Sequence, residues 1–122
     1  MTIFTDFRAA LIGDSAVMAI ANQVYRGQPS QEAPAPFVVF HLIDENAQES
    51  LQDEASLQNL VFQVDAWAAD LDTADTLWRT VKAALRASPN FKFIRRARRE
   101  LYEKDTDLHR VSVDLSVWYT ET

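Results

Sequence analysis

The stretch Asn59–Ala68, NLVFQVDAWA, limits what this chain can fold into more than any other segment. Its side chains repeat with a period of two residues, which is typical of a strand half-buried in an antiparallel sheet. One side of the pattern carries Leu60, Phe62, Val64 and Ala66, and the other carries Val61, Gln63, Asp65 and Trp67. The stretch therefore predicts a sheet with one apolar face and one more polar face.

The C-terminal segment Leu108–Thr120 repeats this design. It also places an Asp and a Trp, Asp114 and Trp118, on the side opposite its aliphatic residues. Phe37–Ile43 is a dense run of β-branched and aromatic residues and predicts the first long strand. Phe91–Lys104 predicts a strand that pairs with the last one as an antiparallel hairpin.

Helical spacing of apolar residues marks three segments. Residues 3–12 are followed by Gly13, which predicts a helix end, and residues 16–22 predict a short second helix. The segment Asp72–Ala87 has the clearest apolar stripe, and we expect Asp72 to cap its N-terminus. Between the short helix and the first long strand, Val24 and Tyr25 suggest a brief extended segment.

These elements predict an α+β fold in the order α-β-β-α-β-β. We expect a four-stranded, mainly antiparallel twisted sheet with helices packed on one face. A chain of 122 residues with 48% hydrophobic residues is long enough for one domain spanning residues 1–122, and too short for two ordinary ones. There is no cysteine, so disulfides and thiolate metal sites are excluded.

Two connections differ from the rest in composition. Residues 27–36 contain three of the four prolines and predict an ordered, non-helical connection. Residues 44–56 are polar and acidic, and we expect a mobile loop that becomes ordered only against a partner. The loop lacks the spacing and central glycine of a calcium-binding loop. Its carboxylates are Asp44, Glu45, Glu49, Asp53 and Glu54.

The formal net charge is −6, and an acidic protein repels nucleic-acid phosphates. The N-terminus lacks the basic start of a signal peptide, and no apolar run is long enough to span a membrane. We therefore expect a soluble intracellular protein, or part of one.

The sequence contains few of the residue patterns that are typical of catalytic sites. His41 and His109 lie on different predicted strands without metal-ligand spacing, and there is no nucleophile motif or glycine-rich phosphate loop. Asp65 and Asp114 occupy matching strand positions and could approach each other as a metal or acid–base pair. Polar positions on a sheet face explain them more simply. We predict no enzyme activity and no cofactor.

Four arginines within five residues, Arg95, Arg96, Arg98 and Arg99, stand out against the acidic background. They could protect a strand edge from aggregation, pair with an acidic patch on a neighbouring copy, or contact nucleic acid. Opposite charges on separate segments favour head-to-tail association, which can close into rings. Trp67 and Trp118, on the more polar face, are of the kind that anchors interfaces.

Taken in order, the segments resemble the tail-completion, or tail-terminator, family of long-tailed phages and prophages, similar to the lambda tail terminator. The resemblance covers nearly the whole chain and rests on its organisation rather than on a single motif. Its parts are FRAALIGDSAVMAIANQVYRG, APAPFVVFHLID, LVFQVDAWAADLDTADTLWRTVKAAL and VSVDLSVWY.

The resemblance implies a structural role. A homo-oligomeric ring, expected to be a hexamer, would sit on the head-proximal end of the tail tube, end tube polymerisation and help to join the tail to the head. The implied partners are other copies of the chain, the tail tube protein and the head-connector protein, with DNA met only in passing through the lumen and no membrane contact. The expected location is the virion tail, and the host bacterial cytoplasm during assembly.

Two other functions stay open at this point. The chain could be another head–tail connector or neck component. It could instead be a nucleic-acid-binding module that uses the strand containing Arg95–Arg99, in which case its DNA binding would depend steeply on salt.

Overall fold

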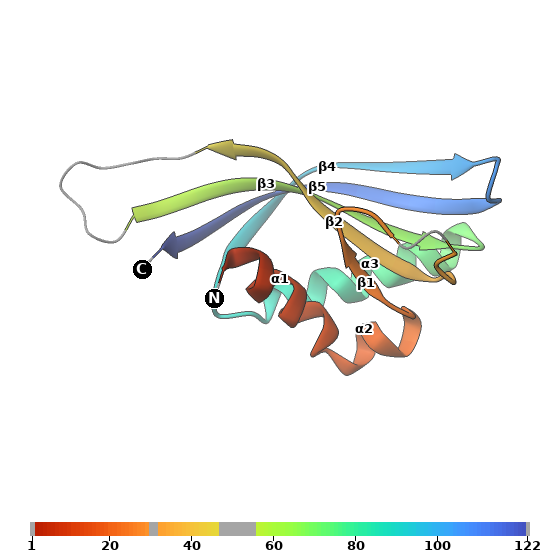
Figure 1. Ribbon diagram of the computed structural model, residues 1–122, viewed down its shortest axis with the longest axis horizontal. Coiled ribbons are helices and arrows are strands. Elements are labelled where there is room, and N and C mark those ends of the chain that lie inside the picture. Colours follow the sequence, from red (N-terminus) through yellow and green to blue (C-terminus); the bar gives the residue numbers. More distant parts are fainter. Residues whose placement is uncertain (1, 30–31, 47–55, 122) are drawn as a thin grey trace.

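The structure is a computed structural model that describes residues 2–29, 32–46 and 56–121. Within those ranges the chain forms helices and strands that make one sheet and one helical layer (Figure 1). The helices are α1 (Ile3–Ile12), α2 (Ser15–Ile20) and α3 (Leu71–Arg86). The strands are β1 (Val24–Arg26), β2 (Phe37–Asn46), β3 (Ser56–Ala68), β4 (Lys92–Glu103) and β5 (Leu108–Glu121).

The sheet has five strands in the order β1-β2-β3-β5-β4, so the expectation of four strands is wrong by one. The additional strand is β1, which pairs in parallel with Val38–Phe40 of β2 and makes the sheet mixed. The remaining pairs are antiparallel, as predicted. A strand of three residues is too short to produce a visible alternation, which is why the sequence indicated only a brief extended segment there.

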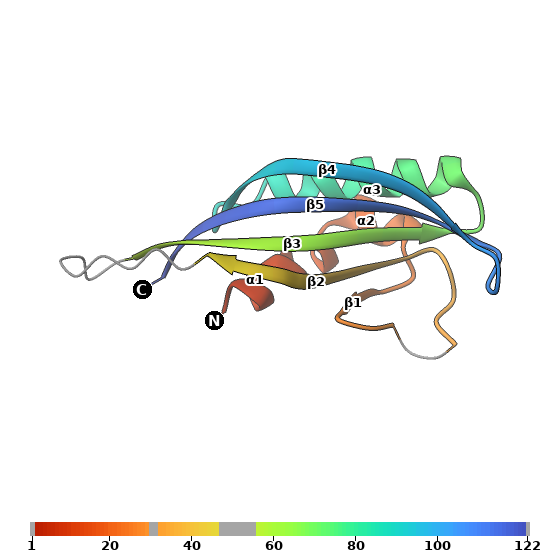
Figure 2. The same ribbon diagram turned by 90° about the horizontal axis from the view of Figure 1, so that it is seen from above.

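All three helices lie on the same side of the sheet (Figures 1 and 2). The aliphatic positions of β3 and β5 face them, and together they form the core. Phe7 of α1 is fully buried and lies 4.9 Å from Phe40, 4.7 Å from Phe62 and 5.4 Å from Phe91, measured between ring centroids. This aromatic cluster fixes α1 against the sheet.

The other face of the sheet has no described helix over it (Figure 2), and we call it the open face. Val61 and Asp65 of β3 lie on it, opposite Ser116 and Ser112 of β5. Its further residues, assigned from strand register, are Phe37, Val39, His41 and Asp44 of β2; Asn59, Gln63 and Trp67 of β3; Asp114 and Trp118 of β5; and Ile94, Ala97 and Arg99 of β4.

Side-chain caps set where the helices begin. Thr2 caps α1 and Asp14 caps α2, each accepting a hydrogen bond from a backbone N–H of the first turn. The cap of α3 is Asp70, whose Oδ1 accepts from the Thr73 N–H at 2.7 Å. The expectation that Asp72 caps this helix is therefore wrong, and Asp72 lies within the first turn.

The strands around the acidic segment are longer than predicted. β2 extends to Asn46 and β3 begins at Ser56, so both ends of the loop expected at 44–56 belong to strands. Asp44 and Glu45 are paired with Val61 and Leu60 of β3. The other acidic residues of that segment, Glu49, Asp53 and Glu54, lie outside the described residues.

Candidate assembly surface

The arginine cluster on β4 is divided between the two sides of the sheet. Arg95 pairs with Leu115 of β5 and Ala97 pairs with Asp114, so Arg96 is the extra residue of a β-bulge. The bulge places Arg95 and Arg98 on the helix side and Arg99 on the open face. The sequence suggested one basic patch, whereas the fold makes two.

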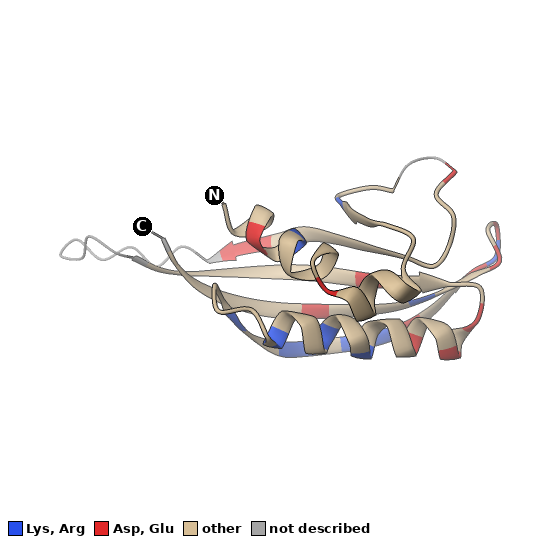
Figure 3. Cartoon of the chain, turned by 90° about the horizontal axis from the view of Figure 1, so that it is seen from below, with Lys and Arg blue, Asp and Glu red and all other residues tan. Residues whose placement is uncertain are grey.

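On the helix side, Arg98 bridges β4 and α3. Its Nη1 lies 2.8 Å from Asp75 Oδ1, and its Nη2 lies 2.8 Å from Glu100 Oε2. Arg79 reaches the same Asp75 from one helical turn away, at 3.0 Å. Figure 3 shows that stretches of α3 and β4 that contain Lys and Arg residues lie along the same long edge of the molecule. Arg98 is therefore occupied within the chain and holds the edge strand to the helix.

On the open face, Arg99 is paired as well. Its Nη2 lies 2.8 Å from Asp114 Oδ1 and donates to Ser112 Oγ at 3.4 Å. Asp65, on the neighbouring strand, has Arg110 at 3.6 Å. The two carboxylates raised as a metal or acid–base pair thus lie on one face of adjacent strands, each next to an arginine.

No group of three or more His, Asp or Glu residues that could hold a metal occurs in the described part of the chain. Asp65 is only 3% exposed, and burial raises the pKa of its carboxyl, with the Ser112 hydrogen bond and the Arg110 charge partly offsetting this. Asp65 therefore has the features of a structural polar contact, and among the described residues no third ligand accompanies the two carboxylates.

Several buried polar atoms of the open face lack a hydrogen-bond partner among the described residues. They are His41 Nδ1, Asp65 Oδ1, Trp67 Nε1 and Arg110 Nε. Because buried polar groups normally find partners, these atoms give the open face unused hydrogen-bonding capacity. The sequence offered no signal for this cluster, since each residue comes from a different position along three strands.

The two tryptophans are half-buried and lie at opposite ends of the open face. Trp67 stacks on Phe37 at 5.8 Å and has the Arg110 guanidinium 4.9 Å from its ring. Trp118 pairs with Asn59, whereas Trp67 pairs with Arg110. At about 3.3 Å per residue, the two rings are roughly 26 Å apart along the sheet. They therefore form two separate aromatic positions.

Arg95 and Arg96 remain without an ion pair among the described residues, unlike Arg98 and Arg99. Arg96 borders a hollow on the open face together with Ala97, Asp114 and Val61, and Asp44 and Ile43 line its other side. Asp44 and Glu45 are both exposed and likewise have no cationic partner in the described ranges. The free charges of this surface are thus basic on β4 and acidic on β2.

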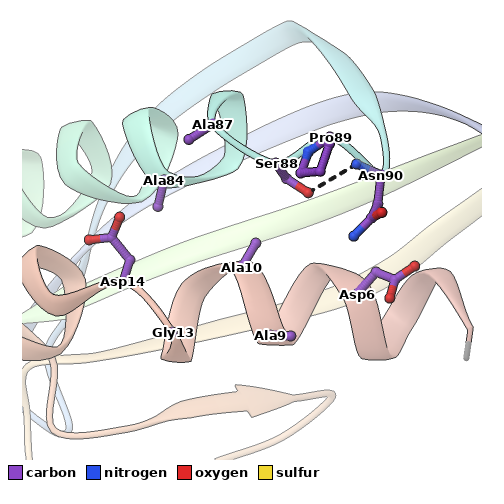
Figure 4. A pocket seen from close by; sticks show the side chains of 10 residues that line it. All are labelled: Asp6, Ala9, Ala10, Gly13, Asp14, Ala84, Ala87, Ser88, Pro89 and Asn90. Atoms are coloured by element: carbon purple, nitrogen blue, oxygen red, sulfur yellow. Dashed lines mark hydrogen bonds between the residues drawn. The ribbon is translucent and has the colours of Figure 1, made fainter.

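A further hollow lies between α1 and the end of α3 (Figure 4). It is lined mainly by small residues, with Asp6 and Asp14 on one side and Ser88 and Asn90 on the other. Asp14 already accepts hydrogen bonds from Ala16 and Val17 as the cap of α2. The hollow therefore brings together no convergent set of groups suited to chemistry.

The family model for tail completion protein gp17 matches residues 5–120 of the chain. The chain belongs to this family of phage tail-completion proteins. Membership identifies it as a structural component of phage tails. No curated protein matches the chain. No helix in the described ranges is long and apolar enough to cross a membrane.

Two solved structures similar to this family member share its fold. One, from the virion of a native gene transfer agent particle, has a TM-score of 0.69 at 17% identity, covering 98% of this chain and 95% of that one. The other, the gp17 protein of bacteriophage SPP1, has a TM-score of 0.63 at 17% identity, covering 93% of this chain and 86% of that one. The family resemblance given by the sequence is confirmed.

Proposed function

We propose that this tail-completion protein forms a ring on the head-proximal end of the tail tube, ends tube polymerisation and helps to join the tail to the head. The family match over residues 5–120 carries the proposal. The separation of free basic charge on β4 from free acidic charge on β2 supports it, because such a chain associates head to tail with copies of itself.

The experiment adds the purified protein to polymerising tail tube protein and measures tube lengths by electron microscopy. We expect shorter tubes with a narrow length distribution and a ring at one end only. Unchanged lengths, with no protein at either tube end, would overturn the proposal. Light scattering across a range of concentrations, with and without tubes, then gives the mass of the self-associated form.

The second candidate is another neck or connector component, and the same experiment separates it. A connector component would bind the head side and leave tube length unchanged. The nucleic-acid-binding module is less favoured, because carboxylates of the same chain already occupy Arg98 and Arg99. Retention on duplex DNA at low salt, with no effect on tube length, would favour the nucleic-acid-binding module instead.

A further inference from the structure

The sheet ends in two strand edges that carry unpaired backbone groups. β4 is the last strand at one end of the sheet order. At the other end, β1 pairs only with Val38–Phe40, so the remainder of β2 extends past it without an outer neighbour among the described residues (Figure 2). We call residues 41–46 the free half of β2. Exposed edges of this kind can accept another strand.

The two edges carry opposite charge. Lys92, Arg95 and Arg96 lie on β4 without an ion pair in the described ranges, whereas the exposed charged residues of the free half are Asp44 and Glu45. Salt screens such charges beyond about 8 Å, so they act mainly at close contact. The basic edge of one copy, β4, is therefore complementary in charge to the acidic edge of a second copy, the free half of β2.

The register places these charges at the same height in the sheet. Asp44 pairs with Val61, Val61 with Ser116, and Ser116 with Ile94. Asp44 is therefore level with Ile94, next to Arg95 and the bulged Arg96. A second copy continuing the sheet with little stagger brings the acidic and basic residues opposite each other.

The acidic and basic residues of the two edges also lie on matching sides of the sheet. Asp44 and Arg96 both line the hollow on the open face. Glu45, paired with Leu60, and Arg95, paired with Leu115, both lie on the helix side. One pair of opposite charges thus forms on each side of the sheet when a second copy is added in the same orientation.

We propose that β4 of one copy adds to the free half of β2 of the next copy, so that the sheets continue from copy to copy. This rests on the proposed function and names the surface by which the ring closes. Strand direction allows it, because β2 and β4 run in opposite senses and their pairing across copies is antiparallel.

Charge also disfavours pairing of like edges. Pairing β2 with β2 sets Asp44 and Glu45 against their own copies, and pairing β4 with β4 sets arginine against arginine in the registers that place Arg95 and Arg96 opposite their own copies. The heterologous pair brings Lys92, Arg95 and Arg96 of β4 next to Asp44 and Glu45 of β2. The free half of β2 is thereby protected from pairing with itself while remaining open to β4.

Cysteine crosslinking tests the proposal on a clean background, because the native chain has no cysteine. Asp44→Cys is combined in turn with Lys92→Cys, Ile94→Cys and Ala97→Cys, which scan the open-face positions of β4. Each variant is oxidised in its self-associated state, in solution and on tube ends. We expect a ladder of covalent oligomers for at least one combination, and none for the single Asp44→Cys or Ile94→Cys variant.

The outcomes separate the inference from the proposed function. Self-association at tube ends without any ladder, or disulfide dimers from Ile94→Cys alone, would overturn the strand pairing and leave the ring proposal in place. A protein that never self-associates and never binds tube ends would contradict both the strand pairing and the ring proposal.

Charge reversal provides an independent readout. Arg96→Glu is expected to weaken self-association about tenfold because it opposes Asp44, and adding Asp44→Arg to that variant is expected to restore it. Lys104→Glu, in the turn after β4, makes the same change of charge away from the edge and is expected to leave association unchanged. Equal effects of Arg96→Glu and Lys104→Glu, or no restoration by the double change, would contradict the pairing.

Discussion

Arg98 of β4 and Asp75 of α3 lie 2.8 Å apart and join the outermost strand of the sheet to the helix beneath it. Both side chains are about three-quarters buried, with exposed fractions of 25% and 23%. Asp75 also forms an ion pair with Arg79, so a single carboxylate pairs with two guanidinium groups. The contact fixes the side of β4 that carries Arg95.

Asp75→Asn is expected to lower the free energy of unfolding by about 1 kcal/mol, because it leaves Arg98 part-buried with one fewer partner. Urea denaturation measures the change. Arg79→Gln is the matched control, since Arg79 is 76% exposed and its loss is expected to change stability very little. An equal loss in both variants would show that the bridge to Arg98 contributes nothing.

Asp65 gives the pH dependence of stability a definite sign. Its pKa is raised above the ordinary value of 3.8, chiefly by burial, in surroundings that include Ser112, Arg110, His41 and Arg99. A raised folded-state pKa means that the stability contribution is fully present below the unfolded pKa and is lost as the pH rises through the folded pKa. Because an amide does not ionise, Asp65→Asn removes this pH-dependent loss of stability.

We therefore expect the stability of Asp65→Asn relative to the native chain to improve as the pH rises from about 4 to 7. Urea denaturation at a series of pH values measures the difference. Asp72→Asn, on the exposed first turn of α3, is the charge-matched control. A relative stability of Asp65→Asn that stays flat or falls over this range would contradict the assignment of burial as the main cause.

The two tryptophans are expected to respond differently to truncation. Trp67→Ala removes the stack on Phe37 and the contact with Arg110, and we expect a loss of about 2 kcal/mol. Trp118 has no aromatic partner among the described residues, and Trp118→Ala is expected to cost less than about 1 kcal/mol. Chemical denaturation compares the two, and a larger loss at Trp118 would reverse our ranking.

The start of α3 allows a comparison between two nearby carboxylates. Asp70→Ala removes the hydrogen bonds to the Thr73 N–H and hydroxyl, whereas Asp72→Ala removes only a first-turn charge. We expect Asp70→Ala to lower the thermal midpoint more than Asp72→Ala, as measured by circular dichroism. The Thr73 hydrogen bonds also lower the pKa of Asp70, so the difference is expected to shrink in acid, as the pH falls through that pKa. Equal midpoints near neutral pH would contradict the cap.

Periodicity predicted the parts of this fold whose side chains face the core. The alternation in β3 and β5 and the stripe of α3 follow directly from burial on one side, so those elements lie where the pattern placed them. β1 was not predicted as a strand of the sheet, because three residues are too few to show a two-residue alternation. The cap of α3 was misplaced because Asp70 and Asp72 both suit a helix start, and only backbone geometry decides between them.

The candidate surface was less predictable. The sequence identified the arginines and the acidic residues, but a bulge decides which side of the sheet each arginine occupies, and nothing in the local pattern marks it. The partners of Arg98 and Arg99, Asp75 and Asp114, come from segments distant in the chain. Such contacts depend on the register between strands, which a single sequence does not specify.

The bulge at Arg96 has a consequence for how this hairpin can vary in length. If the same residues paired without a bulge, Arg99 and not Arg98 would point toward α3, Arg98 would take the place of Arg99 opposite Ser112, and Asp75 would lose the arginine that it now binds. Deleting Arg96 itself would instead remove the bulge and leave Ala97 opposite Asp114, so Arg98 and Arg99 would keep the sides of the sheet that they now occupy. Natural variation at this position is therefore expected to include strands one residue shorter.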